Sequence, residues 1–258
     1  MRWTRLAAAA ILAAGSFAVP MTRPSADASV PPVASAVDVV AEPSADVVAA
    51  TASVRIPGDL GWISSNWAGY AVNSGPYTSV SGQWTVPTLT ASRRDGYSAM
   101  WVGIDGFDNA SLIQAGTEAD YYGGAAHYSA WWEILPASAE TVPTLSVRAG
   151  DTITVSIARV SSGRWRIAIK DSRGGSYSTT RSYAGAGTSA EWIEEAPLIG
   201  RHATQLAHHA SVRFRDVAAN GVNPRLAVAD GGAMIRHGVV AIAPSLPDAR
   251  GNGFALAQ

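Results

Sequence analysis

The chain has 258 residues, which is enough for one large β domain or two small domains. Only 15% of the residues are charged and the net charge is −1, so the composition gives no reason to expect a nucleic-acid partner or binding to an anionic membrane. The sequence has no cysteine, which excludes disulfides, thiolate metal sites and a cysteine nucleophile.

The N-terminus has the features of a secretory signal peptide over residues 1–28. Arg2 and Arg5 supply a positive start, an alanine-rich apolar run follows over Leu6–Val19, and Ala26-Asp27-Ala28 offers a cleavage site. The apolar run is too short for a membrane span, so we expect no stable anchor and a secreted, extracellular protein.

Residues 29–63 consist mostly of Ala, Val, Ser and Pro and show no strand alternation. Such a stretch has too few aromatic residues to build a core, so it is either a disordered linker or a pro-segment that is removed on maturation. The folded domain is expected over residues 64–258.

That domain reads as β structure throughout. Short runs of alternating or β-branched residues recur between Gly, Pro, Asn, Asp and Ser, and no run has a sustained helical stripe. The predicted strands are Trp67–Val72, Ser79–Val86, Tyr97–Asp105, Ala126–Ile134, Leu145–Val147, Thr152–Val160, Trp165–Asp171, Ser176–Ser182, Glu191–Glu195, Ala210–Arg215 and Met234–Ala243. Many short strands without helices favour an antiparallel sandwich or a barrel, and the pattern does not decide between them.

The stretch from Tyr97 to Pro136 carries the most chemical information. In its first strand Met100, Val102 and Ile104 share one face, while Trp101 shares the other face with Gly103 and Asp105. In its last strand Trp131 and Glu133 lie on one face together. Tryptophans beside carboxylates and small residues are typical of a binding cleft built on a sheet.

Six blocks, in the right order, resemble the motifs of the glutamic peptidase (eqolisin) family. The blocks are NWAGY at 66–70, QWTVP at 83–87, WVGIDG at 101–106, LIQAG at 112–116, YSAWWEILP at 128–136 and AEWIEEAP at 190–197. The resemblance covers residues 64 to 258 and implies a curved sandwich of two large antiparallel sheets (concanavalin-like). It also implies a precursor with a pro-segment.

The resemblance also assigns roles. Gln114 and Glu195 match the family's catalytic Gln and Glu. In that family the Glu activates water and then protonates the leaving nitrogen, while the Gln holds the tetrahedral intermediate. The residues expected to bind substrate or support the site are Trp67, Trp101, Asp105, Glu118, Trp131 and Glu133. A carboxylate base without histidine or metal predicts an acid pH optimum, provided that its pKa is not pushed far upward.

Some positions keep simpler explanations. Asp105 could begin a turn at Asp105-Gly106, Trp67 could be a core residue, and Glu194 would point to the face opposite Glu195. Glu118 occupies a position where the family often has Asp. The cysteines that stabilise loops in many fungal members are absent, which suggests a bacterial-type branch. These departures leave substrate preference open more than reaction type.

We therefore expect a monomeric acid endopeptidase that acts on polypeptides and needs no cofactor or metal. The adjacent pair His208-His209 lacks metal-ligand spacing. Two alternatives remain open. One is a glycoside hydrolase that uses Asp105, Glu133 and Glu195, since glycosidases need two acids around the bond. The other is a non-catalytic sandwich whose tryptophans bind carbohydrate or peptide.

Overall fold

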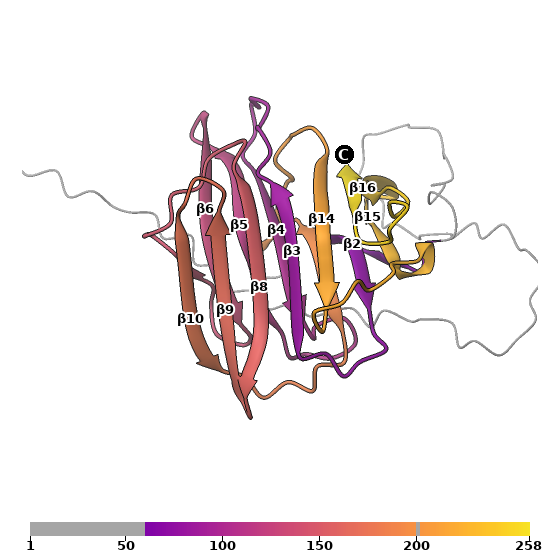
Figure 1. Ribbon diagram of the computed structural model, residues 1–258. Helices are drawn as coiled ribbons and strands as arrows, with labels where there is room; N and C mark the ends of the chain where they lie inside the picture. Colours follow the sequence, from indigo (N-terminus) through magenta and orange to yellow (C-terminus); the bar gives the residue numbers. More distant parts are fainter. Residues whose placement is uncertain (1–59, 200–201) are drawn as a thin grey trace, which may run out of the picture.

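The computed structural model describes residues 60–199 and 202–258. The expected signal peptide and nearly all of the expected pro-segment lie outside these residues. In the described part, two antiparallel β-sheets stack face to face (Figure 1). This confirms an all-β sandwich rather than a barrel.

The first sheet, sheet I, contains the strands that carry five of the six motif blocks; the sixth block, QWTVP, lies in the second sheet. Its order is β7 (Glu140–Thr141), β6 (Ala125–Ile134), β5 (Ile113–Tyr122), β4 (Gly96–Ile104), β11 (Ala190–Glu195), β2 (Trp67–Val72), β15 (Gly231–Arg236) and β16 (Val239–Pro244). The short β1 (Trp62–Ser64) pairs with β15 in parallel, which is an exception to the antiparallel pattern.

The second sheet, sheet II, lies in front of sheet I in Figure 1. Its order is β10 (Ser176–Ser182), β9 (Arg164–Asp171), β8 (Thr152–Ser161), β3 (Ser79–Thr85), β14 (Val212–Ala219) and β17 (Phe254–Ala257). Strand β16 pairs with both β15 and β17 and so joins the two sheets along one side. A short antiparallel pair, β12 (Leu198–Ile199) with β13 (His202–Ala203), and one 3₁₀ turn, η1 (Val228–Asp230), complete the described elements.

Alternation along the strands creates the main core between the sheets. Met100, Val102 and Ile104 of β4 are fully buried there, against Ile153, Ile157 and other apolar residues of sheet II. The opposite, outer face of sheet I holds a separate apolar cluster, which includes the site tryptophans. The predicted alternation of β4 and β6 is thus confirmed: one face of each strand lies in the core between the sheets, and the other lies on the outer face of sheet I.

Most predicted strands are present with ends shifted by one or two residues, and Ala210–Arg215 corresponds to β14, Val212–Ala219, but two predictions were wrong. Leu145–Val147 is not a strand; Leu145 and Val147 are buried in a connecting segment whose backbone turns. Met234–Ala243 is two strands, because His237 and Gly238 adopt positive φ and make a hairpin turn. The predicted strand ranges also missed β5, which begins in the LIQAG block and runs over Ile113–Tyr122.

Candidate active site

The site is built on four neighbouring strands of sheet I. Strands β11, β4, β5 and β6 lie side by side, so Glu191, Gly103, Gln114 and Glu133 form one row across the sheet. Two residues further along, Ile193, Trp101, Gly116 and Trp131 form the next row. Residues two apart on a strand share a face, so both rows present their side chains to the outer face.

Glu195 ends β11 and is the hub of the site. Its carboxylate accepts hydrogen bonds on both oxygens, from Trp101 Nε1 at 2.9 Å and from Asn66 Nδ2 at 3.1 Å. The side chain is buried. Burial raises the pKa of Glu195 and the charge of Glu133 raises it further, while the hydrogen bonds from Trp101 and Asn66 act in the opposite direction.

The Asn66 amide is itself held in place. Ser64 Oγ donates to Asn66 Oδ1 at 3.2 Å, which directs the Asn66 amide nitrogen to Glu195. Ser64 Oγ also accepts the backbone N–H groups of Asn66 and Trp67. The bend between β1 and β2 therefore fixes one donor of the Glu195 carboxylate.

Gln114 and Glu133 form the second part of the site. Gln114 Nε2 donates to Glu133 Oε2 at 2.6 Å, and both side chains are buried. Gln114 Oε1 and Glu133 Oε1 have no hydrogen-bond partner among the described residues. Burial raises the pKa of Glu133 to about 7, against the hydrogen bond from Gln114. The contact fixes the orientation of the Gln114 amide and leaves its second N–H free to bind another group.

Three predicted tryptophans lie on the same face. Trp67 packs edge-on against Trp101, with ring centroids 4.8 Å apart and an interplanar angle of 77°. Trp67, Trp101 and Trp131 belong to the outer-face cluster, with Leu112 and Ile193. They lie on the outer face of sheet I rather than in the core between the sheets, and Trp67 is a buried member of this outer-face cluster.

Gly116 explains how two of these indoles fit. A Cβ at this position would lie 2.0 Å from the Met100 carbonyl oxygen and 2.7 Å from the Trp101 Cβ. Only glycine lets β5 approach β4 this closely beside Trp101. The Gly of the LIQAG block is therefore needed for close strand packing beside the site.

Asp105 does not take part in this cluster. It follows β4 with φ of 67°, and its carboxylate accepts hydrogen bonds from Tyr183 Oη, the backbone N–H groups of Gly187 and Thr188, and Asn109 Nδ2. These bonds lower the pKa of Asp105 although burial acts to raise it. Its supporting role is structural: Asp105 ties the 105–111 loop to the 183–189 segment.

Glu118 lies on the site face but one row beyond Trp101. It pairs across the strands with Ala99, which in turn pairs with Glu195. Ser129 Oγ donates to Glu118 Oε2 at 2.9 Å, and burial raises the pKa of Glu118. Glu118 thus lies in the same row as Glu195, two rows from Gln114.

Sequence reasoning missed Asn66 and Tyr183 and did not identify a partner for Glu194. Asn66 begins the NWAGY block, so its place in a motif was a usable signal, but only the fold shows that it reaches Glu195. Tyr183 lies 78 residues from Asp105 and nothing in the local sequence pairs them.

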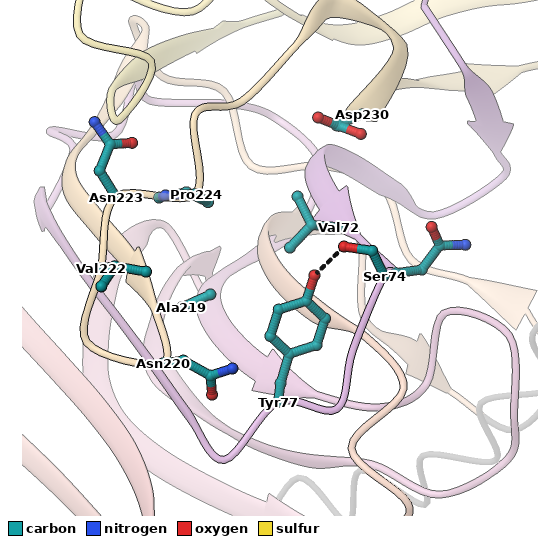
Figure 2. Close-up of a pocket in the computed structure, with 10 residues that line it drawn as sticks. Val72, Ser74, Tyr77, Ala219, Asn220, Val222, Asn223, Pro224 and Asp230 are labelled. Carbon is teal, nitrogen blue, oxygen red and sulfur yellow. Dashed lines mark hydrogen bonds between the residues drawn. The ribbon is translucent and has the colours of Figure 1, made fainter.

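A cavity of about 320 Å³ lies elsewhere, at the other end of β2 and β11 from Glu195 (Figure 2). It is bordered by the β2–β3 connection and by residues 219–224. Ser74 Oγ and Tyr77 Oη lie 3.1 Å apart in its wall, and the Asn220 side chain is bonded to Thr78 and Pro76. Its polar groups hold the connecting loops, and it contains none of the site residues predicted from the sequence.

Residues 60–199 and 202–258 contain no group of three or more His, Asp or Glu side chains arranged to hold a metal ion. Nor does any helix in them have the length and apolar character needed to cross a membrane.

The family is shown by comparison with known sequences. Residues 65–239 match the model of the peptidase A4 family, and this span is more than half of the chain. The chain therefore belongs to the peptidase A4 family.

Two curated relatives are similar over part of their length. The chain is 30% identical over 182 residues to aspergillopepsin-2 of Aspergillus niger, covering 60% of this chain and 64% of the relative. It is 28% identical over 138 residues to scytalidopepsin B of Scytalidium lignicola, covering 52% of each. The chain thus spans less than two thirds of the relatives it matches.

Solved structures support the fold. A crystal structure of scytalido-glutamic peptidase with a transition state analog inhibitor matches with a TM-score of 0.64 at 22% identity, covering 76% of this chain and 98% of that one. The crystal structure of aspergilloglutamic peptidase from Aspergillus niger matches with a TM-score of 0.54 at 24% identity, covering 63% and 98%.

Proposed function

We propose that the protein is a glutamic endopeptidase that hydrolyses peptide bonds of polypeptides with water activated by Glu195. The observation that carries this proposal is the convergence of Glu195, Gln114 and Glu133 on one face of sheet I, in a chain of the peptidase A4 family. A buried carboxylate that can act first as base and then as acid, together with an amide held by a second carboxyl group, suits a reaction that needs proton transfer and an oxyanion donor.

Glu195 is the general base. Each of its oxygens accepts one hydrogen bond and keeps a further lone pair for a water molecule. Glu195 takes a proton from the water as it attacks the scissile carbonyl, and then gives this proton to the leaving nitrogen. The hydrogen bonds from Trp101 and Asn66 hold the carboxylate in one orientation through both steps.

Gln114 is the oxyanion donor. Its amide carries two N–H groups; Glu133 accepts one of them, and the other is left for the negative charge that develops on the carbonyl oxygen. Glu133 is a positioning residue, because it acts through the Gln114 amide. The three tryptophans provide apolar walls that reduce the water content around the reacting groups.

The pH dependence differs from that of an exposed carboxylate. The ordinary pKa of Glu is 4.5, and burial raises that of both Glu195 and Glu133. The basic form of Glu195 is therefore lost at a higher pH than for an exposed Glu, and we expect the acid limb of kcat/KM to lie above pH 4.5. A strongly acid optimum would require a Glu195 carboxylate with an ordinary pKa. Burial raises the pKa of Glu195, so we do not expect such an optimum.

The N-terminal region adds three further parts of the proposal. Residues 1–28 direct secretion, residues 29–63 are a pro-segment, and the mature enzyme is an extracellular monomer. N-terminal sequencing and light scattering of the protein from culture medium test them: a start between residues 50 and 65 is expected, and a start at Met1 would contradict them.

The function is tested by cleavage of a denatured protein substrate from pH 2 to 8. Glu195→Gln should lower kcat by about 10²–10⁴-fold, because the general base is lost. Gln114→Ala should lower kcat by about 10²–10³-fold, because an oxyanion donor is lost. Ser178→Ala, on the exposed face of β10, is the control and should leave kcat unchanged.

Each result has a clear reading. Undiminished activity in Glu195→Gln would make Glu133 the base, and undiminished activity in Gln114→Ala would remove the amide from the mechanism. Absence of proteolysis by the matured wild-type protein at every pH would overturn the proposed function, and turnover of a polysaccharide would favour a glycosidase.

A further inference from the structure

The core between the sheets contains a buried pair that the proposed reaction does not use. His209 Nε2 lies 2.8 Å from Glu194 Oε1, and both side chains are fully buried. Glu194 precedes Glu195 on β11 and points to the opposite face, toward sheet II. The same strand therefore presents one carboxyl group to the site and one to the core.

The hydrogen bonds of His209 determine how many protons the pair holds. Its Nδ1 faces the carbonyl oxygen of Ala210, and its Nε2 faces the Glu194 carboxyl group. A carbonyl oxygen can only accept, and a neutral imidazole has one N–H. Both bonds form only if the pair holds one proton more than a neutral imidazole and a carboxylate. In agreement, the pKa of His209 is raised, by its bond and attraction to Glu194, although burial acts to lower it.

His209 belongs to a segment, residues 203–210, that we call the strap. The strap runs from β13 toward β14 and is bonded to the chain before and at the start of β4. Thr90 N donates to the His208 carbonyl at 2.7 Å and Tyr97 N donates to the Gln205 carbonyl at 2.8 Å. The Arg236 guanidinium donates to the carbonyl groups of Ala203 and Thr204. His209 is the residue through which the strap reaches the β11 side chains.

We propose that the His209–Glu194 pair is a proton-dependent latch, which fastens the strap to β11 in acidic medium and releases it as the medium becomes alkaline. Loss of the extra proton removes one of the two His209 hydrogen bonds. It also leaves the Glu194 carboxylate without a cationic partner in the core, where its second oxygen, Oε2, already has no hydrogen bond among the described residues. An unpaired buried charge is strongly destabilising.

The direction of the effect follows from linkage. The pKa of His209 in the folded protein is raised above its ordinary value of 6.5. The stabilisation is therefore complete below about pH 6.5 and is lost as the pH rises through the folded pKa. Release of the strap would expose the start of β4, which borders the site. The site would therefore stay intact only in acidic and neutral media.

The surroundings of the pair supply few competing charges. The β2 and β4 residues paired with Glu194 are Ala68 and Met100, which do not titrate. On the strap side, His208 is exposed, Arg236 contacts backbone only, and the Tyr128 hydroxyl contacts the Leu89 N–H next to the bridge between Leu89 and His209. The raised pKa values of Glu133, Glu191 and Asp120 also reduce stability with rising pH, but their effect begins near the ordinary carboxyl range.

The test compares unfolding of the full chain by urea from pH 5 to 9, with Glu195→Gln present throughout to limit self-digestion. Relative to His209→Gln in the same background, the unfolding equilibrium constant of the latch-bearing protein should increase by up to about tenfold per pH unit above pH 6.5. His208→Gln, which changes the exposed neighbour, should follow the latch-bearing protein. Parallel curves for the latch-bearing protein and His209→Gln would overturn the proposal.

A second measurement does not depend on the stability of a variant. In ¹⁵N-histidine spectra of the unaltered fold, both ring nitrogens of His209 should be protonated at pH 6.5 and should titrate only above this value. Loss of the extra proton from the His209–Glu194 pair below pH 6.5, seen as a titration of the ring nitrogens in that range, would overturn the latch. Both readouts measure protonation and stability rather than turnover, so the latch and the proposed peptidase activity can fail independently.

Discussion

At the scale of single residues, the site depends on how a buried carboxyl group is kept in an ionisable state. Glu195 loses water by burial, and Trp101 and Asn66 replace part of that solvation with N–H groups. Hydrogen bonds to a charged group contribute about 1.5–3 kcal/mol each, which is enough to move a pKa by a unit or more. The tryptophans therefore determine the charge of the site as well as its shape.

Trp101→Phe tests this role of the indole. Phenylalanine keeps an aromatic ring in the cluster but removes the N–H that Glu195 accepts, so the pKa of Glu195 should rise and the acid limb of kcat/KM should move up by about one pH unit. Trp131→Phe is the matched control, because Trp131 Nε1 has no hydrogen bond among the described residues. An equal shift in both variants, or no shift in Trp101→Phe, would show that the Trp101 hydrogen bond does not set this pKa.

At the scale of the elements, the close approach of β4 and β5 at Gly116 places Gln114 two rows from Glu195 on the same face of sheet I. Gly116→Ala should lower the free energy of unfolding by about 1–3 kcal/mol, because the new Cβ would collide with the Met100 carbonyl and Trp101. Urea unfolding measures the change, with Ser178→Ala as a surface control. A Gly116→Ala protein as stable as the wild type would mean that the two strands can separate without cost.

The loops that frame the site depend on Asp105. Asp105→Asn keeps the size of the side chain but replaces one acceptor oxygen with a donor, so the bonds from the Gly187 and Thr188 N–H groups cannot all persist. We expect a loss of about 1–3 kcal/mol of stability and faster hydrogen exchange confined to residues 105–111 and 183–189. Faster exchange throughout β4 and β11 instead would contradict a role limited to these loops.

The elements also show what could be read from the sequence. The alternation in β4 and β6 predicted which residues face the core, because period two survives any packing of the sheet. The motif blocks located Gln114, Glu133 and Glu195. The contacts of Asp105 with Tyr183 and of Glu194 with His209 could not be predicted, because they join segments whose approach is set by sheet topology and loop paths rather than by local pattern. For the same reason, the hydrogen bond from Asn66 to Glu195 could not be predicted from the sequence.

At the scale of the whole molecule, acidic groups buried on the outer face of sheet I make stability depend on pH. Burial raises the pKa of Glu133, Glu191 and Glu195 above 4.5, so folding favours their protonated forms. Their contribution to stability is complete below pH 4.5 and is lost as the pH rises through the folded pKa values. The midpoint of thermal unfolding should therefore fall from pH 4.5 toward pH 8, and a midpoint that rises over this range would contradict the raised values.

The central claim is that Glu195 activates water instead of attacking the peptide itself, and a single-turnover reaction in H₂¹⁸O tests it most directly. With enzyme in excess over a peptide substrate, direct attack by water puts one ¹⁸O atom into the new carboxyl group of the product in the first turnover, and mass spectrometry should find Glu195 unlabelled. A first-turnover product with unlabelled oxygen, together with ¹⁸O in the peptide that contains Glu195, would show a covalent intermediate on Glu195 and contradict the proposed mechanism.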